Sequence, residues 1–268
     1  MKGLGKWCGL MLLAAMPARA DEALQKIFDC MHANLPPTLR VQHIELENTD
    51  RSGSTRILKG RLYAMREKSA GSEGLIRAML HIDVPDYLAG AAWLVREGKP
   101  GADDEMYVFL PSVNRVRRVI GDAGYDSMLG TNFSYVDFKQ LENGFGGVPA
   151  ATLEAPQQIE QRPVHVISFK AQAGTAAGAS GYSAIRTWID QKTCMTLKAD
   201  FYDGSAVRKE FTAPAAALRQ SGVYWYLSQG QMRDLRDGTN TLLRILDVSS
   251  SEELPTRLFD PRLFYLGK

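Results

Sequence analysis

Residues 106–119 read MYVFLPSVNRVRRV, and this stretch predicts the kind of fold that the chain adopts. An aromatic, β-prone run turns at Pro111 and is followed by a basic run that returns alongside it, which is typical of a β-hairpin. Two interpretations of Arg115, Arg117 and Arg118 stay open. They form either a solvated strand face with cross-strand partners or a basic rim that meets phosphate or carboxylate head groups.

Similar strand-like runs extend in both directions from this hairpin. Turn signals such as DRSG at residues 50–53, Asp203-Gly204 and Asp237-Gly238 separate them. Roughly a dozen strands in sequence, joined by short turns, favour an antiparallel barrel or a strongly curled sheet. The predicted strands cover residues 39–46, 56–66, 75–84, 91–96, 105–110, 115–120, 164–170, 182–190, 195–202, 206–211, 222–233 and 239–248.

Many of these strands have one apolar face and one mixed face. In residues 56–66, Leu58 and Leu62 alternate with Lys59 and Arg61. Large aromatic and methionine side chains join the pattern in several strands. Such faces are compatible with an internal cavity, and a half-solvated sheet would produce the same pattern.

The first twenty residues have the composition of a secretory signal peptide. Lys2 and Lys6 precede an apolar run, GLMLLAAM at residues 9–16, and Ala18-Arg19-Ala20 offers small residues for cleavage. The run is shorter than the roughly 20 residues that span a bilayer. Cys8 lies before the run and is therefore not the acylated cysteine of a lipoprotein signal. We predict a signal peptide over residues 1–20 and a periplasmic mature chain from Asp21.

Charge argues against a nucleic-acid partner. The whole chain carries a formal charge of +2, and removal of Lys2, Lys6 and Arg19 with the signal changes it to −1. A near-neutral mature protein lacks the basic footprint of nucleic-acid binding.

Three helices are predicted. The first covers residues 21–33, where Leu24, Ile27, Phe28 and Met31 recur at helical spacing. A second covers residues 134–141, because Ser134 and Asp137 match a capping box. A third follows Asp260-Pro261, which places a cap before a first-turn proline. Residues 171–181 (AQAGTAAGASG) are interpreted as a long hairpin loop.

A search for chemistry finds no catalytic or cofactor motif. There is no phosphate-binding loop, dinucleotide fingerprint or nucleophile elbow. The histidines, which are His32, His43, His81 and His165, show no metal-ligand spacing. We therefore expect no enzyme, no cofactor and no metal, with only a catalytic set assembled from distant residues left as an alternative.

Two cysteines remain after the signal, Cys30 and Cys194. An oxidising compartment permits a disulfide between them, which the chain-entropy model values at about 5 kcal/mol. The alternative is two separate buried thiols.

Several motifs resemble those of the bacterial outer membrane lipoprotein-sorting protein family, within the LolA/LolB-like superfamily. They are residues 107–119 (YVFLPSVNRVRRV), residues 127–138 (SMLGTNFSYVDF), Trp188-Ile189-Asp190, residues 201–204 (FYDG) and Lys209. The resemblance covers nearly the whole mature chain. It implies a mainly β fold with a few helices: a curled antiparallel sheet that forms an unclosed barrel with a helical lid. Residues 21–268 would then be a single domain.

The resemblance also implies a function, namely a periplasmic carrier that shelters a lipid or the acyl chains of a lipoprotein on the way to the outer membrane. Exposure of an acyl chain costs about 0.8 kcal/mol per CH₂, so a water-soluble carrier must bury it. Partners would be an RND-type inner-membrane transporter or an outer-membrane acceptor. Ten residues are predicted to line the cavity, and for each of them dense core packing is the alternative. They are Tyr63, Met79, Trp93, Tyr107, Phe109, Met128, Leu129, Phe133, Trp188 and Tyr202.

The helices at residues 21–33 and 134–141 would form the lid. If Cys30 pairs with Cys194, the helix at residues 21–33 is tethered to the sheet. Another element, such as Met128-Leu129-Gly130, would then have to move to open the cavity. Two further hypotheses remain. One is a docking accessory with a filled barrel and an exposed apolar or basic patch, and the other is a hydrolase on the same scaffold.

Overall fold

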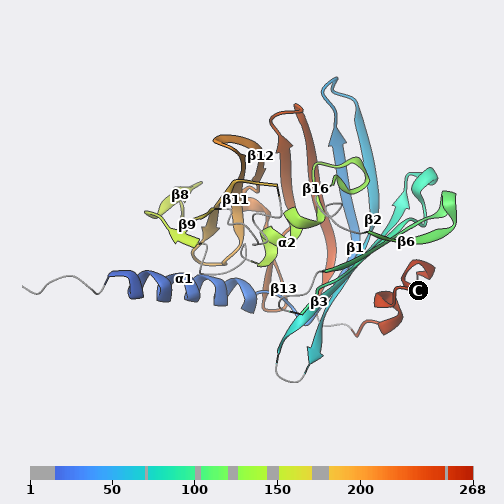
Figure 1. Ribbon diagram of the computed structural model, residues 1–268, viewed down its shortest axis with the longest axis horizontal. Coiled ribbons are helices and arrows are strands. Elements are labelled where there is room, and N and C mark those ends of the chain that lie inside the picture. The colour runs from blue at the N-terminus through green and yellow to red at the C-terminus, as the bar shows by residue number, and fades with distance from the viewer. Residues whose placement is uncertain are drawn as a thin grey trace, which may run out of the picture.

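One large antiparallel sheet organises the protein. The computed structural model describes residues 16–69, 72–99, 104–119, 126–143, 151–170, 181–250 and 253–267. The sheet has 14 strands in the order β6-β5-β4-β3-β2-β1-β16-β15-β12-β11-β10-β9-β7, with β8 pairing to β9. It is strongly curved and does not close on itself (Figure 1). The predicted class, a mainly β fold with an unclosed, LolA-like barrel, is confirmed.

The first half of the sheet is a meander in which each strand pairs with the next. Its strands are β1 (Thr38–Thr49), β2 (Thr55–Ser69), β3 (Ser72–Val84), β4 (Ala92–Arg96), β5 (Glu105–Leu110) and β6 (Arg115–Val119). The second half contains β7 (Ala151–Leu153), β8 (Gln157–Ile159), β9 (Arg162–Lys170), β10 (Ala184–Asp190), β11 (Thr196–Asp203), β12 (Ala206–Thr212), β15 (Gln229–Asp234) and β16 (Thr239–Ser249). Pairing of β16 with β1 joins the two halves.

The predicted hairpin at residues 106–119 is present as β5 and β6, turned by a short 3₁₀ helix, η2 (Pro111–Val113). The single strand predicted over residues 222–233 is wrong. Gly222 takes a left-handed φ of 60° and turns the chain into a separate hairpin of β13 (Leu218–Ser221) and β14 (Tyr224–Leu227). Ser228 is where the chain changes partner. Its backbone N–H still donates to the carbonyl of Ala217 in that hairpin, whereas its own carbonyl accepts from the N–H of Ile245 on β16, and β15 then begins.

Two α-helices lie against the sheet. Helix α1 (Met16–Ala33) buries the predicted stripe of Leu24, Ile27, Phe28 and Met31. Helix α2 (Tyr135–Asn143) starts at the predicted capping box: Ser134 Oγ accepts from the N–H of Asp137 at 3.1 Å, and Asp137 Oδ2 accepts from the N–H of Ser134 at 2.9 Å. Neither helix within the described ranges is both long and apolar enough to cross a membrane.

The two faces of the sheet carry different cores. The inner face, marked by Leu58 and Leu62, packs against α1, α2 and Phe133. The outer face, marked by Tyr63 and Met79, packs against the end of the chain. Successive residues of a strand point to opposite faces, so each strand contributes to both cores.

The end of the chain forms a strap over the outer face. This C-terminal strap, residues 253–267, contains two 3₁₀ helices, η7 (Thr256–Phe259) and η8 (Phe264–Leu266), which contact β3 and β4 (Figure 1). The predicted α-helix after Asp260-Pro261 is therefore corrected to a turn followed by one short 3₁₀ helix. Phe264 is fully buried, and the rings of Phe109 and Tyr265 stack at 4.2 Å.

Two predicted features fall largely outside the described residues. The predicted signal peptide overlaps them only at residues 16–20, where the backbone of α1 continues. The predicted hairpin loop at residues 171–181 is described only at Gly181, although the strands it joins, β9 and β10, do pair antiparallel.

Candidate functional site

An apolar cavity lies between the inner face of the sheet and the helical side of the molecule. The space not filled by atoms amounts to about 1220 Å³, part of which is open to solvent. Strands β1 to β4, the chain just after α1, and the segment that carries α2 form its walls. The apolar lining includes Leu35, Pro36, Leu39, Ile44, Leu46, Leu62, Ala64, Ile76, Ala78, Leu80, Val95, Met128 and Phe138.

The cavity continues along the sheet. A second space of about 870 Å³ shares Leu39, Ile44, Leu62 and Phe138 with the first and extends beneath α2 to Phe133. The shared lining makes the two spaces one elongated apolar trough. We call the two together the inner cavity.

One segment, residues 127–134, forms part of the cavity wall and is held by polar contacts at its ends. Arg56 Nη2 donates to the carbonyl of Leu129 at 2.7 Å. The N–H of Asn132 donates to Thr241 Oγ1 at 2.8 Å. Directly after Asn132, Phe133 is fully buried and stacks on Phe138 with ring centres 4.7 Å apart. The segment is thus fixed to β2 and β16 as a preformed wall.

A buried polar cluster fixes α2 to the sheet. The carboxylate of Asp137, which is fully buried, accepts from Lys209 Nζ at 3.0 Å and from the Tyr182 hydroxyl at 2.9 Å. Burial, followed by the nearby charge of Asp137, raises the pKa of Tyr182 far above its usual range. The sequence showed the Ser134–Asp137 cap but carried no local signal that Lys209 and Tyr182 would meet it.

Few polar groups interrupt the cavity wall. Arg66, Glu97 and Tyr135 lie at its lining, and the Tyr135 hydroxyl donates to Asp104. The indole N–H of Trp93 is buried without a hydrogen-bond partner among the described residues. Leaving a buried donor unpaired costs about 1–3 kcal/mol, so this N–H is an unsatisfied donor in a residue of the cavity wall.

The structure brings four of the ten predicted lining residues to the inner side. Trp93 and Met128 line the inner cavity, Phe133 closes its deeper part, and Leu129 packs against the inner core. Their neighbours on the same strand faces, such as Leu62 and Ala78, were missed. The alternation of β2 and β3 places them on one face, but it does not show which face is concave.

The prediction is corrected for the other six residues, because the structure places them on the outer face. Tyr63, Met79, Tyr107 and Phe109 lie on the side covered by the C-terminal strap. Trp188 packs with Val164, Val166 and Leu197 in a separate outer core, and Tyr202 has the same strand parity as Trp188 across the β10–β11 pair. Both faces of this sheet are covered, so aromatic content does not mark the inner one.

The three predicted rim arginines lie on the edge strand β6. The register with β5 puts Arg115 and Arg117 on the inner side and Arg118 on the outer side, where it pairs with Glu105 at 3.5 Å. Val119, on the inner side, lines a recess that shares Trp93 and Met128 with the inner cavity. Arg115 and Arg117 therefore continue the cavity wall as exposed charges.

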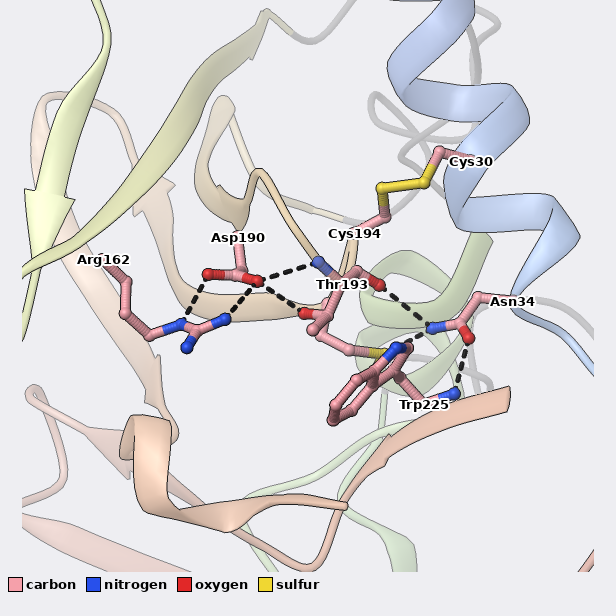
Figure 2. The surroundings of a disulfide bond; sticks show 8 residues. Cys30, Asn34, Arg162, Asp190, Thr193, Cys194 and Trp225 are labelled. Atoms are coloured by element: carbon pink, nitrogen blue, oxygen red, sulfur yellow. Dashed lines mark hydrogen bonds and ion pairs between the residues drawn. A yellow bond between two sulfur atoms is a disulfide. The ribbon is translucent and has the colours of Figure 1, made fainter. Parts of the chain in front are cut away.

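Cys30 and Cys194 form a disulfide that ties α1 to the turn between β10 and β11 (Figure 2). The same turn is braced by Asp190, whose carboxylate accepts two hydrogen bonds from Arg162, at 2.7 and 2.8 Å, and one from the Thr193 hydroxyl at 2.7 Å. The amide of Asn34 donates to the Thr193 carbonyl and accepts from the N–H of Trp225. The predicted lid helix is thus anchored at its C-terminal end.

Low pH should weaken the hydrogen bonds that Asp190 accepts in this turn. Burial opposes ionisation of Asp190, but hydrogen bonds from Arg162 and Thr193 outweigh it and hold the pKa below the usual value. A lowered pKa contributes stability above the unfolded-state pKa, and that stability is lost as pH falls through the folded-state pKa. Asp190→Asn should therefore lower the free energy of unfolding by about 2–3 kcal/mol near neutral pH. Below about pH 4 the difference from wild type should shrink.

Urea unfolding at a series of pH values measures this difference. Asp86→Asn is the matched control, because Asp86 is exposed and the described residues offer its side chain no partner. A gap between wild type and Asp190→Asn that stays constant down to pH 2 would contradict the assignment.

A family model described as "Uncharacterized protein" matches residues 76–264. No curated protein matches the sequence.

Three solved structures share the fold. A DUF1329 family protein from Desulfovibrio piger is 18% identical, with a TM-score of 0.79 over 90% of this chain and 97% of that chain. An outer membrane lipoprotein-sorting protein domain from Vibrio parahaemolyticus is 19% identical, with a TM-score of 0.77 over 91% and 99%. A LolA superfamily protein from Nitrosomonas europaea is 16% identical, with a TM-score of 0.63 over 88% and 97%. The fold resemblance predicted from the sequence motifs is confirmed.

Proposed function

This chain belongs to the family whose model matches residues 76–264 and has the fold of LolA-like lipoprotein-sorting proteins, and from that premise we propose that it is a periplasmic lipid carrier. It would hold a lipid, or the acyl chains of a lipoprotein, in the inner cavity and carry it towards the outer membrane. The observation that supports this most directly is the elongated apolar trough beneath α2. The proposal involves no covalent chemistry.

The cavity suits an acyl chain that carries an ester or amide. Its aliphatic wall would bury methylenes, each worth about 0.8 kcal/mol. The unpaired indole N–H of Trp93 would donate to the carbonyl oxygen next to the chain. Arg115 and Arg117 on β6 would meet a phosphate or carboxylate head group outside the cavity, because a guanidinium matches such groups well.

Filling the cavity should abolish ligand uptake. Ala64 and Ala78 are cross-strand partners that both line the trough, so Ala64→Phe/Ala78→Phe places two rings in it. Affinity for cis-parinaric acid, a fluorescent fatty acid, should fall about tenfold for each pair of methylenes excluded. Fluorescence titration measures the affinity, and native mass spectrometry with solvent extraction of wild type should show bound lipid.

The control is Ala206→Phe, which adds a ring at an exposed position of β12. It should bind the probe as wild type does. Equal binding by Ala64→Phe/Ala78→Phe, or a wild type that takes up no probe and yields no lipid, would rule out the carrier proposal.

A docking accessory is the second candidate, and the exposed edge strand β6 favours it. Within the described ranges β6 pairs on one side only, and Arg115 and Arg117 are exposed and have no partner, so this edge is a surface that another protein can engage. The partner would be an RND-type inner-membrane transporter or an outer-membrane acceptor. Crosslinking from position 117 to such a partner, together with full function of Ala64→Phe/Ala78→Phe in cells, would favour docking over carriage.

A further inference from the structure

A second hollow lies on the outer face, between the sheet and the C-terminal strap. Its unfilled space amounts to about 1310 Å³, partly open to solvent. Unlike the inner cavity, it is lined largely by charged groups. The charged lining comprises Glu67, Arg77, Arg96, Arg257, Asp260 and Arg262. We call this space the arginine hollow.

The floor of the hollow places two arginines side by side. Arg77 on β3 and Arg96 on β4 are direct cross-strand partners. Like charges directly opposite each other destabilise a sheet unless anionic groups compensate them. Glu67 pairs with Arg77 Nη2 at 2.6 Å, and Glu105 accepts from Arg96 Nη1 at 3.2 Å.

These contacts leave donors unused. Arg77 is only 8% exposed, and its Nη1 donates to the Glu97 carbonyl at 2.6 Å. The Nε groups of both Arg77 and Arg96 are nonetheless buried and have no hydrogen-bond partner among the described residues. Both side chains also line the hollow, so its floor holds guanidinium groups whose hydrogen-bond donors the described residues satisfy only in part.

The strap adds two more cations from above. Arg257 and Arg262 line the hollow, are exposed, and have no side-chain partner within the described ranges. The carboxylate of Asp260 is partly engaged, since its Oδ1 accepts from the N–H of Arg262 at 2.8 Å. The lining therefore carries four arginines against two acids, an excess of positive charge around unpaired donors.

We propose that the arginine hollow binds a phosphate group, either as free phosphate or as the head group of a phospholipid. Guanidinium groups bind phosphate through paired, charge-assisted hydrogen bonds, and a phosphate dianion would balance the excess of four arginines over two acids in the lining. The site is separate from the inner cavity because it lies on the opposite face of the sheet. It does not depend on the carrier proposal.

The test uses Arg257→Gln/Arg262→Gln, which removes two exposed cations and leaves Arg77 and Arg96 in place. Calorimetric titration with inorganic phosphate forms one arm, and cosedimentation with vesicles of phosphatidic acid in phosphatidylcholine forms the other. Wild type should bind at least one of these probes saturably. The variant should bind it about tenfold or more weakly, since each lost charge-assisted hydrogen bond weakens binding.

The matched control is Lys170→Gln/Lys192→Gln, which removes the same charge at exposed positions elsewhere. It should bind as wild type does. Saturable binding of inorganic phosphate identifies free phosphate as sufficient, and binding confined to phosphatidic acid vesicles identifies a lipid head group. Binding of neither probe, or equal loss in both variants, overturns the proposal, while uptake of cis-parinaric acid tests the carrier function separately.

Discussion

Breaking the Cys30–Cys194 disulfide should lower the free energy of unfolding by about 5 kcal/mol in the chain-entropy model. The two cysteines are 164 residues apart, so breaking the bond opens a long loop and raises the conformational entropy of the unfolded chain. For a domain of this size the midpoint of thermal unfolding should fall by roughly 10–20 °C. Thermal scans of wild type with and without a reducing agent measure the shift.

The double variant Cys30→Ser/Cys194→Ser is the control for this experiment. It should unfold at the temperature of the reduced wild type and should not respond to the reducing agent. An unfolding midpoint of wild type that is unchanged by reduction would mean that the bond contributes nothing. In that case the contacts of Asn34 and the packing of Leu24 and Phe28 alone hold α1.

Removing the carboxylate of Asp137 should also lower the free energy of unfolding strongly. Asp137→Ala leaves the ammonium of Lys209 buried with no counter-charge, deprives the Tyr182 hydroxyl of its acceptor and removes one of the two hydrogen bonds of the capping box of α2. Breaking a buried pair on one side costs about 3–5 kcal/mol. Urea unfolding should show that loss at neutral pH.

A double-mutant cycle separates the pair from its surroundings. Lys209→Met alone should also destabilise, because Asp137 then remains buried without its cation. The combination Asp137→Ala/Lys209→Met should cost less than the two single changes together, since it leaves no unpaired charge. Strict additivity of the three measurements would show that the two groups do not interact.

The strand pattern was predictable because it is local. Hairpins such as β5–β6 show both their alternation and their turn within about a dozen residues of sequence. The helix with its stripe at Leu24 and Phe28, and the cap at Ser134, were predictable for the same reason. The strand predicted over residues 222–233 was wrong because the chain changes partner at Ser228, whose carbonyl accepts from the distant Ile245, and no local turn residue marks that change.

The lining of the cavity was only partly predictable. Alternation separates Tyr63 from Leu62, but it does not say which of the two faces is concave. Here both faces are covered, the outer one by a strap at the far end of the chain. Large aromatics such as Phe109 therefore serve to seat the strap, whereas small and aliphatic side chains such as Ala78 leave the free space.

The sheet ends at β6 on one side and at β7 on the other, and among the described strands these two edges do not pair. A closed barrel has a girth set by its number of strands and their stagger. An open one can flatten or tighten without giving up any interstrand hydrogen bond. On the carrier proposal, the volume of the inner cavity is therefore expected to vary with the curvature of the sheet, because the number of strands does not fix it.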